Sequence, residues 1–338
     1  MKGGEGLRRK VQLVWDWRLA RILDGEGRCV DESAWQESRT ASALADRLAL
    51  LSTGRMTEEA STLSQRFPEA IAISCAEIDD WPELTAEHAA LLAEATIKLA
   101  ERGVAASAAD PDRRLEHLVH ATDEMRTAHN TLESRLVEWV GMFLPRLDLD
   151  GRRSEIAGAV ADASDLDSLG GALDVSTAEV EIGAPEWAGL HKTGVQIVSL
   201  ESSLNGLESA VRELATSHLP SLSLLLGPLL AAQLCVTAHG RARLARLPAS
   251  TVQVLGAEKA FFMHLAQGTD PPKHGHIFQH PWICRSPRWM RGSLSRMLAA
   301  KAAIAARVDH FGGEPWTSKQ VAEVEQKVGE IRRRRARR

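Results

Sequence analysis

The chain has 338 residues, with 41 Lys and Arg against 45 Asp and Glu, and its formal net charge is −4. Hydrophobic residues make up 44% and charged residues 25%, which is typical of a folded globular protein and excludes long disorder or a collagen-like repeat. At this length we expect two or three domains. The four cysteines form no CxxC pair, so we expect reduced thiols in an intracellular protein rather than a disulfide framework.

The sequence shows no targeting or membrane segment. No apolar stretch with a cleavage site follows the basic first ten residues, so we expect no secretory signal. The most apolar segment, residues 219–235, is interrupted by Pro220 and Pro228 and falls short of the roughly 20 residues that a membrane span needs. We therefore expect this segment to be buried core, and no membrane association.

Residues 1–109 mix strand and helix signals. Residues 11–17 and 70–74 are strand candidates, whereas residues 42–51 and 86–102 are rich in Ala, Leu and Glu and are helix candidates. This mixture predicts a small α/β or α+β domain. A glycine-rich phosphate loop is absent from this segment, so nothing in it indicates nucleotide binding.

Residues 110–219 carry two heptad seams. Asp110-Pro111 is a good helix start, and Pro145 and Pro220 end the two helices. Apolar residues recur at alternating spacings of three and four, which is typical of a coiled coil. The predicted seam consists of Leu118, Met125, Leu132, Leu136, Trp139, Leu200, Leu204, Leu207, Val211 and Leu214.

The two helices are expected to fold back as a long antiparallel coiled coil, joined by short helices and loops over residues 151–192. A globular bundle is the alternative, and spacing alone does not separate the two. The same heptads serve an intrachain hairpin or self-association between two chains, and both remain open.

The charge is divided unevenly along the chain. From His239 onward there are 19 Lys and Arg against 7 Asp and Glu, whereas the first 238 residues have a net charge of −16. A basic terminus on an acidic body favours binding of a polyanion such as RNA. Residues 222–236, 256–265 and 291–311 are predicted as helices, and residues 332–338 are interpreted as a basic tail.

Between the last two helices, residues 271–292 combine cations with flat rings. RNA recognition uses Lys and Arg for phosphates and aromatic or guanidinium planes for bases. Lys273, His274, Arg285, Arg288 and Arg291 are candidates for phosphate contacts, and His274 and Trp289 are candidates for stacking. Phe278 and Trp282 are more simply core residues.

Metal binding and catalysis have weaker support. His274, His276, His280 and Cys284 are zinc-type ligands within 11 residues, but their spacing matches no common zinc pattern, so we expect no metal. The sequence contains no HExxH, GxSxG or Walker loop, so we also expect no enzyme activity.

The strings at residues 247–262 (LPASTVQVLGAEKAFF), 271–281 (PPKHGHIFQHP) and 298–309 (LAAKAAIAARVD) resemble the Nop-domain family. The resemblance is strongest to its archaeal members, the core scaffold of box C/D small ribonucleoproteins. Residues 110–139 resemble the family's first coiled-coil helix. Phe261 stands where the family usually has Leu, and Ser293 where it usually has Lys.

The resemblance implies a non-catalytic scaffold that bridges a kink-turn RNA, already bound by its ribosomal-like kink-turn protein, to the methyltransferase fibrillarin for guided 2′-O-methylation of rRNA or tRNA. It implies no cofactor on this chain, because S-adenosylmethionine belongs to fibrillarin. The implied RNA-facing residues comprise the GAEK string, the PKHG string and a following basic helix. These are Gly256, Ala257, Glu258, Lys259, Lys273, His274, Gly275, Arg291, Arg296, Lys301 and Arg307.

Taken together, we expect a mainly α protein with an N-terminal α/β fibrillarin-binding domain (1–109), a coiled coil (110–219), an all-helical Nop domain (220–331) and a basic tail (332–338). We also expect a cytoplasmic location, because the long lysine-rich tail of the nucleolar relatives is missing. The alternative function is a splicing-type or structural coiled-coil interaction protein with a basic RNA-binding end.

Overall fold

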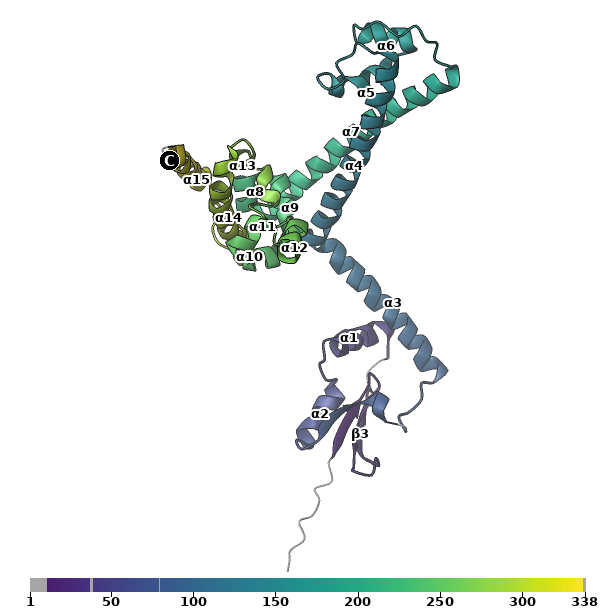
Figure 1. Cartoon of the computed structure of the whole chain (residues 1–338). Coiled ribbons are helices and arrows are strands. Elements are labelled where there is room, and N and C mark those ends of the chain that lie inside the picture. Colours follow the sequence, from purple (N-terminus) through teal and green to yellow (C-terminus); the bar gives the residue numbers. More distant parts are fainter. Residues whose placement is uncertain (1–10, 37–38, 79, 337–338) are drawn as a thin grey trace, which may run out of the picture. The chain divides into compact units, whose positions relative to one another are not determined.

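The computed structural model describes residues 11–36, 39–78 and 80–336, with only the backbone for residues 335 and 336. Residues 1–10, where a secretory signal was considered, and residues 337–338 of the predicted tail lie outside the described residues. The described chain is mainly α-helical with one small N-terminal sheet, as predicted (Figure 1). It forms two compact units, residues 1–109 and 110–338, which are described separately.

The N-terminal unit contains a four-stranded sheet and three α-helices. Its elements are β1 (Gln12–Trp15), β2 (Leu19–Leu23), β3 (Cys29–Ala34), α1 (Ala41–Ser52), α2 (Glu58–Arg66), β4 (Ile71–Ser74), the 3₁₀ turn η1 (Cys75–Glu77) and α3 (Ala86–Ala109). The strand order is β3-β2-β1-β4, in which β1 pairs antiparallel with β2 and parallel with β4. Strands β1 and β4 and helices α1 and α3 match the predicted segments, whereas β2, β3 and α2 were not predicted.

Two small apolar clusters hold this unit together. Leu13 and Ile22 of the sheet pack with Leu63 of α2, and all three are almost completely buried. On the other side, Trp17 and Trp35 pack edge to face beside α1 and α3, with ring centroids 6.3 Å apart. The unit therefore has its own core.

The C-terminal unit begins with a helical hairpin. Its elements are α4 (Pro111–Phe143), α5 (Arg153–Asp162), α6 (Leu166–Ala172) and α7 (Ala184–His218). As predicted, α4 and α7 run antiparallel along each other within one chain, and α5 and α6 cover the far end (Figure 1). The Asp110 carboxylate accepts a hydrogen bond from the Asp112 N–H at 2.9 Å, so it caps α4, and Pro111 occupies the first turn.

The ten predicted seam residues do not all face the partner helix. Nine of them are buried or half-buried, but Leu132 is 38% exposed. A straight helix has 3.6 residues per turn and drifts away from a 3.5-residue seam, which carries Leu132 to the outside. Leu115 and Val119, which the predicted seam omitted, are buried instead.

Short helices follow the hairpin and form the rest of the unit. They are α8 (Pro220–Leu226), α9 (Pro228–Thr237), α10 (Arg241–Arg246), α11 (Ala249–Val254), α12 (Glu258–Gln267), the 3₁₀ turn η2 (His276–Gln279), α13 (Pro281–Cys284), α14 (Arg288–Phe311) and α15 (Ser318–Ala336). The predicted single helix over residues 222–236 is wrong. It is two helices, because Gly227 adopts a φ of 83° and Pro228 starts α9.

The segment 332–338 is also not a simple tail. Its described part, up to Ala336, belongs to α15, which is anchored by Val324 and Val328 at 2% and 1% exposure and by the partly buried Ile331. These three residues recur at helical spacing. The run of arginines that follows them drew the interpretation toward a tail instead of a helix. No single described helix is long and apolar enough to cross a membrane, and the α8–α9 pair, which is apolar enough only when joined, bends by 119°.

An ion-pair bridge between α4 and α7 gives a test of the hairpin. Glu208 of α7 contacts Arg126 of α4 and accepts a hydrogen bond from Arg212 at 2.9 Å. The hydrogen bond from Arg126 is the main cause that lowers the pKa of Glu208. We expect Glu208→Gln to reduce the free energy of unfolding by about 1 kcal/mol at neutral pH.

Because the pKa of Glu208 is lowered on folding, its contribution is present above the ordinary glutamate pKa of 4.5 and is lost as pH falls below that value. The wild type and Glu208→Gln should therefore converge in urea denaturation as the pH is lowered. Glu138→Gln, which removes a highly exposed pair with Arg135 on the same hairpin, should change stability far less. Equal effects of the two substitutions at neutral pH would contradict this assignment.

Candidate nucleic-acid interface

The GAEK and PKHG strings meet in the folded chain at one place, which we call the motif turn (residues 253–259 with 273–276). The Gly275 N–H donates to the Gln253 carbonyl at 2.9 Å, and the His276 N–H donates to the Leu255 carbonyl at 2.8 Å. The Gln253 side chain in turn donates to the Lys273 carbonyl at 2.7 Å. Residues about 20 apart in the sequence are therefore fixed side by side by backbone hydrogen bonds.

Both glycines of the motif turn are required by close packing. Gly256 has a φ of 86°, and a Cβ there would lie 2.1 Å from the His276 ring. A Cβ on Gly275 would lie 2.0 Å from the Leu255 carbonyl oxygen. The Glu258 carboxylate accepts a hydrogen bond from the Gly256 N–H at 2.8 Å, so this residue holds the turn in place.

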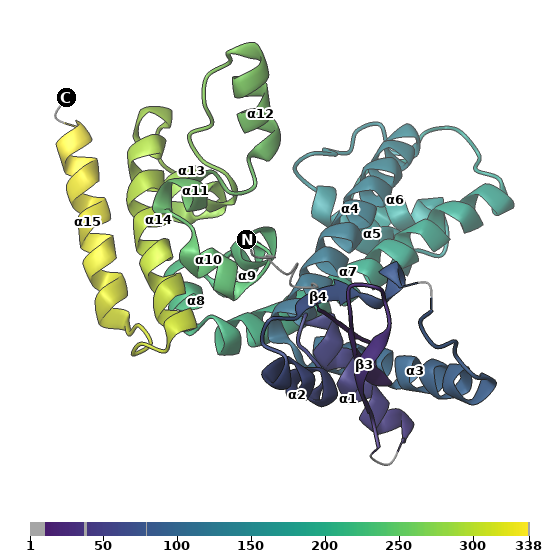
Figure 2. The ribbon, with the colours of Figure 1, turned by 90° about the horizontal axis from the view of Figure 1, so that it is seen from below.

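Helix α12 follows the motif turn and projects away from the neighbouring helices (Figure 2). None of its residues is buried, and Phe262 and Leu265 are each 65% exposed. Phe261 and Phe262 line a cavity of about 380 Å³ together with Val254. An exposed apolar surface of this kind, next to exposed cations, is typical of a protein-docking surface.

Cations of the motif turn fall into two groups. Lys259 and Lys273 are exposed and are available to a phosphate. His274 is half-buried and stacks on Phe278 at 4.5 Å, and Arg291 lies over the same ring at 5.2 Å. Burial, and then the neighbouring Arg291, lower the pKa of His274, which disfavours the charged imidazolium in the free protein.

Two predicted arginines also make contacts within the fold. Arg291 donates from Nε to the Ser286 carbonyl at 2.8 Å, and its guanidinium satisfies the end of the loop after α13. Arg307 donates from Nε to the Ala245 carbonyl at 3.2 Å and so binds α14 to the last turn of α10. Each of these guanidinium groups therefore uses at least one N–H in a hydrogen bond to a backbone carbonyl.

Along α14, the predicted basic residues do not form one patch. Arg296 is exposed, whereas Lys301 is half-buried. Burial, and then Lys327 of α15, lower the pKa of Lys301, so its ammonium group faces α15. Residues five or six apart on a helix point in different directions, which is why the string looked more continuous than the surface is.

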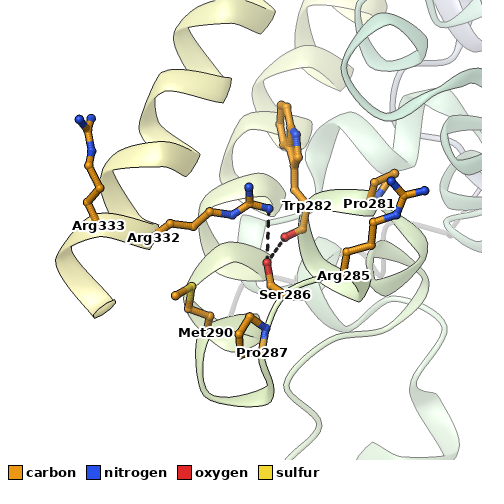
Figure 3. A pocket seen from close by; sticks show the side chains of 8 residues that line it. All are labelled: Pro281, Trp282, Arg285, Ser286, Pro287, Met290, Arg332 and Arg333. Atoms are coloured by element: carbon orange, nitrogen blue, oxygen red, sulfur yellow. Dashed lines mark hydrogen bonds between the residues drawn. The ribbon is translucent and has the colours of Figure 1, made fainter. Parts of the chain in front are cut away.

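A second cationic place lies between α13 and α15, and we call it the arginine groove. It is a cavity of about 730 Å³ with Trp282 and Met290 in its wall and Arg285, Arg332 and Arg333 beside it (Figure 3). Arg332 reaches the Ser286 hydroxyl at 3.5 Å, and this hydroxyl donates to the Trp282 carbonyl at 2.8 Å. Sequence reasoning missed Arg332 and Arg333 because it placed them in a tail. The helical spacing of Val324 and Val328 is the sequence signal that places Arg332 and Arg333 on α15.

Arg288 and Trp289 lie at the start of α14, and Trp289 is 55% exposed, as a stacking residue would be. The structure therefore brings Gly256, Ala257, Glu258 and Lys259 together with Lys273, His274 and Gly275. It places Arg285 in the arginine groove. On α14, the exposed Arg296 and Arg307 lie about three turns apart on one face, whereas Arg291 and Lys301 lie on other faces.

Comparisons with known proteins identify the family of this chain. The Nop family model, described as "snoRNA binding domain, fibrillarin", matches residues 152–331. An uncharacterized NOP5 family protein of Methanocaldococcus jannaschii is 33% identical over 264 residues, which cover 70% of this chain and 61% of that protein. Nucleolar protein 56 of Mus musculus is 31% identical over 225 residues, which cover 60% of this chain and 39% of that protein.

Among solved structures, a crystal structure of a fibrillarin/Nop5p complex matches 94% of this chain and 98% of that chain, with 22% identity and a TM-score of 0.43. The family match spans the connection of the hairpin, α7 and all the short helices that follow. The chain therefore belongs to the Nop family. It spans only part of the length of its curated relatives, 61% of the first and 39% of the second.

The packing of Gly256 gives a test of the motif turn. We expect Gly256→Ala to destabilise the C-terminal unit by about 1–3 kcal/mol, because its φ is positive and the new Cβ overlaps the His276 ring. Gly292→Ala is the matched control, since nothing lies within 4 Å of the new Cβ in helix α14. This control should raise stability by about 0.5–1 kcal/mol. Thermal denaturation measures both, and a neutral Gly256→Ala would refute the packing argument.

Proposed function

We propose that this chain is a non-catalytic scaffold of a box C/D guide ribonucleoprotein. In this proposal it bridges a kink-turn RNA, with its bound kink-turn protein, to the methyltransferase fibrillarin for guided 2′-O-methylation of rRNA or tRNA. The observation that carries the proposal is the motif turn. There, backbone hydrogen bonds hold the GAEK and PKHG strings side by side, next to exposed cations and the exposed apolar side chains of α12. Membership of the Nop family supports the same conclusion.

The motif turn and helix α12 together fit a target made of RNA and protein. Lys259 and Lys273 offer charge to phosphates, whereas Phe261 and Phe262 offer apolar area to a protein. A surface with both features gains most from RNA and protein presented together, because either target alone leaves one half of the surface in water. We therefore propose tight binding to the RNA–protein complex and weak binding to naked duplex.

The separate core of residues 1–109 fits a module that holds another protein. Its sheet leaves edge strands β3 and β4, where Val30 and Ile71 are 56% and 50% exposed. We propose that this unit binds fibrillarin, which would supply both the active site and S-adenosylmethionine. We also propose self-association through the hairpin and a cytoplasmic location.

Lys259→Ala tests the RNA contact. We expect weaker binding to the kink-turn RNA–protein complex, and a slope of log affinity against log salt that is smaller by about 1, because one phosphate contact is lost. Lys319→Ala on α15 is the control, since it removes an equally exposed cation away from the motif turn. Gel-shift titration at several salt concentrations measures both, and identical slopes for the two variants would place the RNA elsewhere.

Removal of residues 1–109 tests the fibrillarin contact. A chain that starts at Asp110 keeps the complete core of the C-terminal unit. It should therefore still bind the kink-turn RNA–protein complex while losing co-purification with fibrillarin. Retained fibrillarin binding would favour a structural coiled-coil interaction protein, in which the hairpin holds the partners.

A further inference from the structure

Three side chains with metal-binding atoms converge where the hairpin meets the short helices. Asp112 lies in the first turn of α4, His218 is the last residue of α7, and Cys235 lies in α9. Their ligand atoms all lie within 4.8 Å of one another. His218 and Cys235 are only 9% and 1% exposed, and Asp112 is half-buried.

The geometry of this cluster is close to one face of a tetrahedral zinc site. With Zn–N, Zn–O and Zn–S bonds of about 2.0–2.3 Å, neighbouring ligand atoms are roughly 3.2–3.7 Å apart. In this chain the His218 Nε2 atom lies 2.7 Å, and the Cys235 Sγ atom 3.4 Å, from the same oxygen, Asp112 Oδ1. The Asp112–Cys235 distance already fits this range, whereas the His218 ring must move away from the carboxylate by at least about 0.5 Å to admit an ion.

We propose that Asp112, His218 and Cys235 bind a Zn²⁺ ion that fastens the base of the hairpin to the helical domain. On binding, the Cys235 thiol releases its proton to solvent, and His218 binds through a neutral Nε2. The carboxylate and the thiolate together balance the two positive charges, so the buried site is electrically neutral.

The surroundings hold the carboxylate in place and leave one coordination position open. The Arg241 N–H donates to both oxygens of Asp112 at 3.0 Å, which fixes the orientation of the carboxylate. Gly240 has a φ of 110°, and a Cβ there would lie 2.8 Å from Asp112 Oδ2. Asp112 also lines a cavity of about 230 Å³ with His239, which gives room for a water molecule or a fourth ligand.

Without the ion, the thiol is unreactive. Burial, and then the nearby Asp112 carboxylate, raise the pKa of Cys235 far above its ordinary value. A divalent ion at this position reverses that electrostatic balance, since a coordinated thiol is deprotonated. Asp112 lies more than 100 residues before the other two ligands, 106 before His218 and 123 before Cys235, so sequence spacing could not reveal the cluster.

The test uses the full chain, stripped of metal and then titrated with Co²⁺ as a spectroscopic probe and with Zn²⁺ for stability. The wild type should show a thiolate-to-cobalt charge-transfer band, and Zn²⁺ should raise its melting temperature by several degrees over the chelated protein. Cys235→Ala should lose both effects. Cys284→Ala removes a half-buried thiol outside the cluster and should keep both.

Substitution of His218 provides a second variant in case Cys235→Ala does not fold. His218→Gln keeps a hydrogen-bond donor toward Asp112 but lacks the imidazole ligand, and it should weaken Zn²⁺ binding at least tenfold. The proposal is overturned if the wild type shows no thiolate band. It is also overturned if Cys235→Ala retains the band, or if Zn²⁺ stabilises the wild type and Cys235→Ala equally. RNA and fibrillarin are absent from these measurements, so their outcome is independent of the proposed function.

Discussion

The C-terminal unit depends on burial of the hairpin base in the same apolar core as the short helices. Leu115 and Val119 of α4 and Val211 and Ala215 of α7 pack with residues of α8, α9 and α14 in one cluster. A fully buried aliphatic side chain contributes about 1.5–3 kcal/mol, so these few contacts are enough to hold the two parts together. The predicted boundary at residues 219–220 therefore passes through this cluster, whereas the far end of the hairpin has a second cluster that includes Leu136, Leu169 and Leu190.

The cations of the basic terminus divide according to what else their donors can reach. Arg291 and Arg307 donate to backbone carbonyls at the ends of neighbouring helices or loops, although Arg307 is also exposed. Those on turns and outer helix faces, such as Lys259 and Lys273, are exposed to solvent. The number of Lys and Arg residues in the region is therefore an upper limit for the number of its phosphate contacts. Some of these residues instead stabilise a domain that is built from many helices.

Local signals allowed the hairpin, most long helices and the mainly α fold to be predicted. The Asp110-Pro111 start, the proline stops and the heptads act within a few turns of helix, so they can be read without tertiary knowledge. Strands β2 and β3 were missed because their burial depends on pairing across the sheet. The roles of Glu258, His274 and Arg291 were missed for a related reason, since each is decided by a neighbour distant in the sequence or by a turn. The motif strings predicted residues that the fold does bring together, but not which of them face outward.

Helix α9 connects the proposed metal cluster with the motif turn. Its Cys235 contacts Asp112 at the hairpin base, and two residues later the Thr237 hydroxyl lies 3.2 Å from the His276 ring beneath the motif turn. Gln233 of the same helix also receives a hydrogen bond from Gln279 of η2 at 2.8 Å. A helix this short does not bend between Cys235 and Thr237. The contacts of these two residues with Asp112 and His276 are both at least partly buried. The direction of the hairpin and the position of the motif turn are therefore set by one rigid element, which is what a scaffold needs if RNA held at one end is to define the position of whatever the hairpin carries.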